Sequence, residues 1–226
     1  MDYYNILLLA ILLDIEMYSV SNYIGNKYIT AYREINPQHK KFYVLKNFLK
    51  SIVLGFFILN YWNIYESIIK NGWNNSEIYS MTIMYIINDL SGLIIVNRKL
   101  PRTTQIHHIC VTILGYFSLK TDYTQPTVMR LVFINAYFSS MAFLVNLFLA
   151  VRIVYPKNRI TYILSIISLF NYIIVCVLNW GIHYFTFYNT YMTNNFDKSY
   201  IYYFIIFHLI MRDDLILMKW LKDFKI

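Results

Sequence analysis

Charged residues are scarce in this sequence, and glycine, proline and cysteine are few. Asp, Glu, Lys and Arg make up 14% of the 226 residues, whereas hydrophobic residues make up 58% and the mean hydropathy is +0.43. Soluble domains carry about 25% charged residues, so this composition excludes an ordinary soluble protein. We therefore expect an integral, multi-pass membrane protein.

The sequence also lacks the common signatures of cofactor and metal sites. Its two cysteines, Cys110 and Cys176, lie in apolar stretches and imply buried side chains rather than a disulfide framework. No nucleotide-binding glycine loop, serine nucleophile elbow or zinc motif is present. We therefore expect no metal and no bound cofactor.

Seven predominantly apolar stretches are long enough, or nearly so, to cross a hydrocarbon core of about 30 Å. They cover residues 5–24, 44–62, 78–97, 105–119, 128–151, 160–187 and 199–220. The fourth reaches crossing length only when the adjacent His107 and His108 are included. This pattern predicts an all-α polytopic bundle of about seven transmembrane helices, forming a single membrane domain over residues 1–226. No basic region or cleavage site marks the first stretch as a signal peptide, so we expect it to be retained.

Most of the Lys and Arg residues fall in alternate connections between these stretches or near the stretch ends beside them, which orients the chain. These clusters are Lys27, Arg33, Lys40, Lys41, Lys46 and Lys50; Arg98, Lys99 and Arg102; Arg152, Lys157 and Arg159; and Lys219, Lys222 and Lys225. Cytosolic loops collect basic residues, so we predict a lumenal N-terminus and a cytosolic C-terminus. The net charge of +8 then follows from topology and needs no nucleic-acid partner. We expect the endoplasmic reticulum or another endomembrane, or a host membrane if the chain is viral.

Ionisable residues inside the apolar stretches are candidates for a functional site. Each ionised side chain near mid-bilayer costs about 2.5–3.5 kcal/mol, so such residues are expected to face the bundle interior and to have partners. Asp89, the histidine pair, and Arg212 with Asp213 fall in one layer, toward the cytosolic leaflet. Adjacent helical histidines point about 100° apart and cannot act as one forked metal ligand. Structural packing of the pair and a catalytic role both remain open.

Other polar positions favour structural roles. His108, Thr112 and Gly115 share a helix face, where another helix or an acyl chain can approach. Asn171, Asn179 and His183 form a stripe that predicts interhelical hydrogen bonds. The acidic residues of the first stretch, Asp14 and Glu16, indicate a helix whose acidic face points inward.

Three motifs follow one another in the middle of the sequence: Tyr85 with Asp89 and Leu90, then the basic run "RKLPR" at 98–102, then the histidine pair. Together they resemble the TLC-domain family, and the resemblance covers residues from about 40 to 220. Further along, Arg130, Ser139, Ser140 and Asn146 stand roughly where many members have an Arg, a serine pair and an Asn.

The resemblance implies a role in lipid biology that depends on the branch of the family. Ceramide synthases transfer an acyl group from acyl-CoA to a sphingoid amine with the histidine pair. Here Asp89 lies 18 residues before His107, Val111 occupies the threonine position, and residues 136–138 lack the carboxylate expected before the serine pair. The spacing is closer to members associated with lipid composition, sensing or trafficking.

Three functions remain under consideration, and the sequence leaves open whether the chain is an enzyme. The first is binding or handling of a membrane lipid, the second is an acyl-CoA-dependent N-acyltransferase, and the third is a transporter or channel. As an acyltransferase, its catalytic residues would be His107, His108 and Asp89. The expected lipid-binding residues are Asp89, Thr112, Ser139, Ser140, Asn146, Arg212 and Asp213. The sequence predicts neither the lipid nor the oligomeric state.

Overall fold

A computed structural model describes residues 3–60, 70–95, 102–156, 158–193 and 196–224, and every regular element in these ranges is a helix. The helices are α1 (Tyr3–Tyr28), α2 (Thr30–Arg33), α3 (Gln38–Asn60), α5 (Asn75–Ile95), α6 (Arg102–Ser118), α7 (Met129–Met141), α8 (Phe143–Val154), α9 (Arg159–Met192) and α10 (Lys198–Asp223). The predicted all-α class is confirmed for the described chain.

Each apolar stretch identified in the sequence coincides with a helix, except 128–151, which forms the pair α7 and α8. Four helices, α1, α3, α5 and α9, are long and apolar enough to cross a membrane, and the bent α7–α8 pair makes a fifth if it counts as one span. Helix α6 has only 17 residues, and α10 carries several charged side chains. The described helices are thus consistent with an integral membrane protein of four or five long apolar helices.

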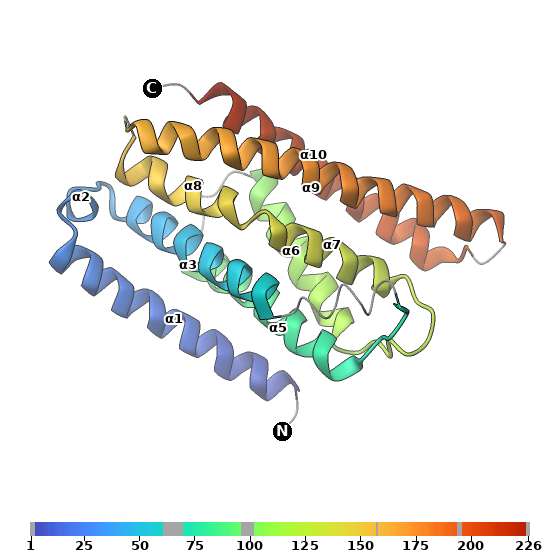
Figure 1. Ribbon diagram of the computed structural model, residues 1–226. Coiled ribbons are helices and arrows are strands. Elements are labelled where there is room, and N and C mark those ends of the chain that lie inside the picture. The colour runs from blue at the N-terminus through green and yellow to red at the C-terminus, as the bar shows by residue number, and fades with distance from the viewer. Residues whose placement is uncertain (1–2, 61–69, 96–101, 157, 194–195, 225–226) are drawn as a thin grey trace.

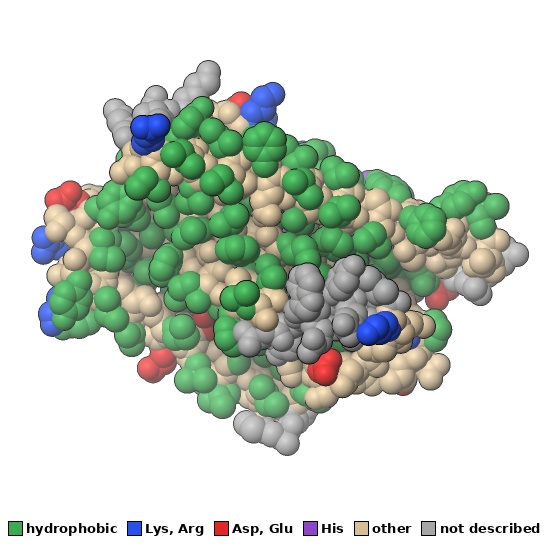
Figure 2. Space-filling model, in the orientation of Figure 1, with side chains coloured by type: hydrophobic (Ala, Val, Ile, Leu, Met, Phe, Trp, Pro, Cys, Tyr) green, Lys and Arg blue, Asp and Glu red, His purple; other side chains and the backbone are tan. Residues whose placement is uncertain are grey.

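Large apolar side chains cover the outside of the bundle. Leu59 is 82% exposed on α3, Ile160 is 70% exposed on α9, and similar residues line the outer face of α1. In Figure 2 hydrophobic side chains spread over the visible face, and most charged side chains lie toward its edges. Exposed apolar surface of this extent is costly in water but suits contact with lipid chains.

The long helices run roughly side by side, and successive ones alternate in direction (Figure 1). Helix α3 packs against α8, α5 packs against α6, and α9 packs against α8 and α10. Between α5 and α6 the approach is close, because a Cβ at Gly115 would lie 2.5 Å from Ile86 Cγ2. The face of α6 that carries residues 108, 112 and 115 therefore packs against another helix. This is one of the two uses predicted for it, the other being contact with an acyl chain.

A bend of 46° separates α7 from α8 at Ala142. No glycine or proline marks this break. The Ser140 hydroxyl donates to the Ala136 carbonyl at 2.9 Å, a bond of the kind that bends helices. Helix α9 supplies donors at the break, since Asn171 Nδ2 lies 2.9 Å from the Met141 carbonyl and Ser168 Oγ 3.0 Å from the Leu144 carbonyl.

The predicted polar stripe of α9 does make interhelical hydrogen bonds. Besides Asn171, Asn179 Nδ2 donates to Asn135 Oδ1 at 2.7 Å. The fully buried His183 ring lies with Nε2 3.1 Å from the Leu131 carbonyl and 2.9 Å from the Tyr203 hydroxyl. The prediction of interhelical bonds is therefore confirmed, and His183 is a packing residue between α7, α9 and α10.

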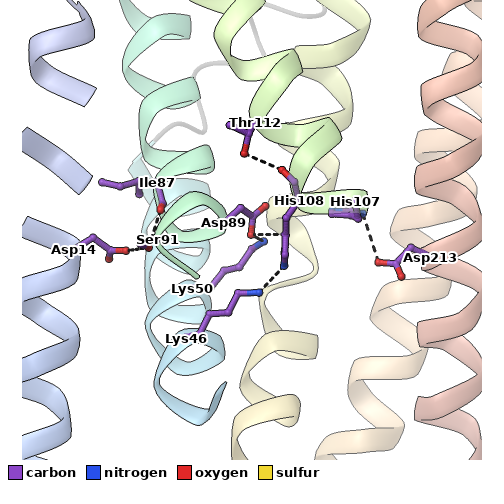
Figure 3. A network of polar contacts seen from close by, with 10 residues as sticks. All are labelled: Asp14, Lys46, Lys50, Ile87, Asp89, Ser91, His107, His108, Thr112 and Asp213. Atoms are coloured by element: carbon purple, nitrogen blue, oxygen red, sulfur yellow. Dashed lines mark hydrogen bonds and ion pairs between the residues drawn. The ribbon is translucent and has the colours of Figure 1, made fainter. Parts of the chain in front are cut away.

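Helix α1 lies at the margin of the bundle and is attached by polar contacts as well as by packing. Asp14 is buried, and its carboxylate accepts from the Ser91 hydroxyl of α5 (Figure 3). Glu16 is exposed. The prediction of an inward acidic face is therefore right for Asp14 and wrong for Glu16, because two residues along a helix correspond to a rotation of about 200°.

The connection between α6 and α7 is held by a polar network. The Arg130 guanidinium donates to the Tyr123 and Thr124 carbonyls and stacks over the Trp73 ring at 4.8 Å. Asn75 Nδ2 donates to Asp122 Oδ1 at 2.8 Å, and this bond, with others from Thr124, holds the pKa of the Asp122 carboxyl below its usual value. This network fixes the end of the bundle opposite to the candidate site.

Candidate functional site

A buried cluster of charged and polar side chains joins α3, α5 and α6 (Figure 3). At its centre Asp89 is fully buried, and its Oδ1 accepts from the Lys50 ammonium. His108 Nδ1 lies 3.1 Å from the same oxygen. The charge of the carboxylate is therefore matched inside the bundle, as a buried charge requires.

The imidazole of His108 links this carboxylate to a second lysine. Lys46 Nζ lies 2.5 Å from His108 Nε2, and both side chains are buried. An imidazole with its proton on Nδ1, toward Asp89, leaves Nε2 free to accept from the ammonium. The cluster therefore forms a chain of contacts from Asp89 through His108 to Lys46.

Space for the Lys46 side chain depends on Gly92 of α5. A Cβ at position 92 would lie 2.7 Å from Lys46 Cε and 2.9 Å from Lys46 Cδ. A residue larger than glycine would therefore push the lysine stem away from its present path. The position of the Lys46 ammonium group on α3 thus depends on a glycine in another helix, α5.

His107 points away from this chain of contacts. Its Nδ1 lies 3.6 Å from Asp213 Oδ2 on α10, and its ring is at 89° to that of His108. The expectation that adjacent imidazoles diverge is confirmed. The two histidines consequently have different neighbours, one inside the buried cluster and one between α6 and α10.

A cavity of about 120 Å³ opens beside the cluster. Its wall combines basic, acidic, hydroxyl and aromatic side chains from α3 and from each of the helices α5 to α10. Residues central to its chemistry are Lys46, Lys50, Tyr85, Thr103, Thr104, His107, His108, Ser139, Asn146, Tyr172, Asp213, Asp214 and Trp220. We call this space the polar cavity.

A second, mainly apolar cavity of about 30 Å³ lies between α3, α5, α6, α7 and α10. Its wall includes Phe57, Ile86, Val111 and Ala136, and Tyr85 belongs to the walls of both cavities. We call this space the apolar cavity. The shared tyrosine makes the two cavities neighbours within the bundle.

The lipid-binding residues expected from the sequence divide into three groups. Ser139, Asn146 and Asp213 line the polar cavity, and Asp89 is buried behind its wall. Thr112 and Ser140 are bonded within their own helices, Thr112 to the His108 carbonyl at 2.8 Å. Arg212 is exposed, because it points about 100° away from Asp213 on α10.

Lys46 and Lys50 are site residues that the sequence does not single out. Both were counted among the basic residues of a cytosolic connection, whereas they lie inside α3 with exposures of 3% and 8%. Their spacing of four residues is the feature of the sequence that indicates a shared site, because residues four apart lie on one helix face. Arg98 and Lys99 of the basic run lie outside the described residues.

The oxygen and nitrogen ligand atoms of Asp89, His107 and His108 lie within 4.8 Å of one another, close enough to hold a metal ion. However, Lys50 is paired with Asp89, and Lys46 contacts His108. Two ammonium groups at these ligand atoms would repel a cation. The cluster therefore suits internal ion pairing better than metal binding.

Comparison with known proteins supplies no assignment: no family model, curated protein or solved structure matches this chain.

Proposed function

We propose that this protein binds a lipid within its membrane domain, with the headgroup in the polar cavity and part of a chain in the apolar cavity. The observation that carries the proposal is the pairing of these two spaces across Tyr85. Amphiphilic ligands require such a pairing, because the charged end needs hydrogen-bonding partners and the hydrocarbon end needs apolar contacts. A role in lipid homeostasis, sensing or trafficking agrees with this use.

The proposal includes a TLC-like fold with seven membrane crossings. Its support is that His108 contacts Asp89, that His107 lies next to them with its ligand atom within 4.8 Å of theirs, and that the helices alternate in direction. The short α6 would span about 25 Å at 1.5 Å per residue. Basic residues at one end of the bundle favour a cytosolic location for that end.

This topology predicts that a tag in the loop 98–104 and a tag at the C-terminus lie on the same, cytosolic side. Three of the proposed seven crossings precede the loop and all seven precede the C-terminus, so an even number of crossings separates the two positions. Cysteine tags would be tested in sealed microsomes with an impermeant alkylating reagent. A tag at Asn74, the first residue of the N-glycosylation sequon Asn74-Asn75-Ser76, serves as the lumenal control. Opposite accessibility of the two cytosolic tags would contradict seven crossings.

If the protein binds lipid in these cavities, the purified protein should retain lipid. A substitution that fills the apolar cavity with a larger side chain should reduce this retention. Ala136→Phe adds a ring at the cavity wall and should lower the amount of retained lipid severalfold, measured by lipid mass spectrometry. Val177→Phe adds the same ring at an exposed position of α9 and should leave retention unchanged. The proposal fails if the wild-type protein retains no lipid, or if Ala136→Phe retains as much as wild type.

An acyl-CoA-dependent N-acyltransferase is the second candidate, and one observation favours it. His107 lines the polar cavity, and His108 is oriented by Asp89 as a general base is oriented by a neighbouring acid. Acyl transfer would convert acyl-CoA and a sphingoid amine to an amide and free CoA. Formation of ceramide by the purified protein, lost in His107→Ala, would establish this activity over binding alone.

A transporter or channel is the weakest of the three candidates. Among the described helices, α7 and α8 form the one bent pair, and α9 side chains bond to carbonyls on both sides of that bend. Broken helices in transporters instead aim freed backbone groups at the transported ion or substrate.

A further inference from the structure

The polar cavity carries opposite charges on different helices. Lys46 and Lys50 approach it from α3, whereas Asp213 and Asp214 approach it from α10. Lys50 is paired with Asp89. Within the described part of the chain, Lys46 has no carboxylate at ion-pair distance, and its ammonium contacts the ring of His108.

The aspartates on the other wall also lack a full positive partner. Asp213 faces His107 at 3.6 Å, and Asp214 Oδ1 accepts from the Tyr172 hydroxyl at 2.6 Å. Neither makes an ion pair with Lys or Arg in the ranges that the structure describes. Lys46 is buried and the two aspartates are partly buried, so leaving these charges without close counter-charges is costly and a ligand that supplies both signs would be favoured.

Three of the four headgroup classes leave a charge unmatched in this cavity. An anionic headgroup satisfies Lys46 but approaches two aspartates, and a cationic one satisfies the aspartates but approaches two lysines. An uncharged headgroup leaves both walls unmatched. A zwitterion matches both, with an anion toward α3 and a cation toward α10.

Aromatic side chains in the same wall support a cation on the α10 side. Tyr172 lines the polar cavity beside the aspartates, since its hydroxyl bonds to Asp214, and Trp220 lines the same cavity nearly two turns further along α10. Aromatic rings combined with carboxylates recognise ammonium groups, including quaternary ones. Phosphate oxygens, in turn, are suitable acceptors for the Lys46 ammonium.

We infer that the polar cavity binds the headgroup of a zwitterionic phospholipid, with its phosphate toward Lys46 and its ammonium toward Asp213 and Asp214. This inference rests on the proposed lipid-binding function and specifies the class of lipid. The headgroup would complete the charge matching that the side chains leave incomplete.

The test is competition among lipids with identical acyl chains, measured by native mass spectrometry of the purified full-length protein. Equimolar phosphatidylethanolamine, phosphatidylcholine, phosphatidic acid and diacylglycerol are supplied together. At least one zwitterionic lipid should be retained roughly tenfold or more above the anionic and uncharged lipids, the scale of one charge-assisted hydrogen bond. Retention of lipid without this preference, or with preference for phosphatidic acid, overturns the inference while leaving lipid binding intact.

Two sets of variants test the assigned orientation. Lys46→Met should reduce the zwitterionic preference, and Asp213→Asn combined with Asp214→Asn should shift retention toward phosphatidic acid. The matched controls, Lys40→Met on α3 and Asp223→Asn on α10, change exposed residues and should leave the preference unchanged. If Lys46→Met does not fold, the aspartate variant still decides, because an unchanged preference there contradicts the inference.

A final arm identifies the source of the zwitterion. Soluble glycerophosphoethanolamine and glycerophosphocholine carry the same headgroups without acyl chains. They should compete at least about tenfold more weakly than the lipids, because the chain contacts in the apolar cavity are missing. Equal competition would overturn the assignment to a phospholipid and indicate a soluble zwitterion. Absence of any lipid retention would instead contradict the proposed function itself.

Discussion

Asp89→Ala is expected to lower the free energy of unfolding by about 3–5 kcal/mol, the usual effect of removing one partner from a buried ion pair. The substitution leaves the Lys50 ammonium buried without its carboxylate. It also removes the group that faces His108 Nδ1 at 3.1 Å. The effect should therefore exceed that of any change at an exposed acid, and it is measured by denaturant or thermal unfolding in detergent micelles.

The double variant Asp89→Leu, Lys50→Met provides the matched control for this prediction. Apolar residues of similar size at both positions remove the unpaired charge, so much of the lost stability should return. Asp223→Ala changes the net charge by the same amount as Asp89→Ala, but at an exposed position. It should therefore have little effect on the free energy of unfolding. Equal loss in the single and double variants would show that the pair does not balance a buried charge.

His108→Ala and His107→Ala are expected to have different effects, although the residues are adjacent. His108→Ala removes the contacts with both Asp89 and Lys46 and should cost about 1–3 kcal/mol of stability as well as lipid binding. His107→Ala removes one 3.6 Å contact at the cavity wall. It should lower lipid retention with a stability change of less than about 1 kcal/mol.

Measuring unfolding and retained lipid on the same preparations separates a functional role from a structural one. A functional cluster requires lower lipid retention in both variants, at a temperature where both remain folded. If His108→Ala only lowers the melting temperature and both variants retain lipid as wild type does, the histidines serve packing alone. That outcome would remove the functional interpretation of the pair.

The helices could be predicted from the sequence because the bilayer imposes a length and a polarity on each of them. Six of the seven apolar stretches coincide with one described helix each for this reason, and 128–151 coincides with the bent pair α7 and α8. Asp89, expected to need partners inside the bundle, has them in Lys50 and His108. The divergence of His107 and His108 likewise follows from helix geometry alone. These features depend on one helix at a time.

Features that depend on contacts between helices were harder to predict. The sequence alone favours loop charges for Lys46 and Lys50, because their partners, His108 and Asp89, lie far along the chain on other helices. Arg212 was expected at the site, although the adjacent Asp213 occupies the inward face. The bend at Ala142 has no glycine or proline signal and depends on bonds from Ser140 and from α9.

The most direct test of lipid binding in the paired cavities is photocrosslinking with a phospholipid that carries a diazirine midway along one chain. Adducts would be mapped by peptide mass spectrometry on the full-length protein in vesicles. The account predicts adducts on residues of the apolar cavity, such as Ile86, Val111 and Ala136, and their loss in Ala136→Phe. Adducts confined to outward-facing residues, such as Ile160 and Val177, would contradict it.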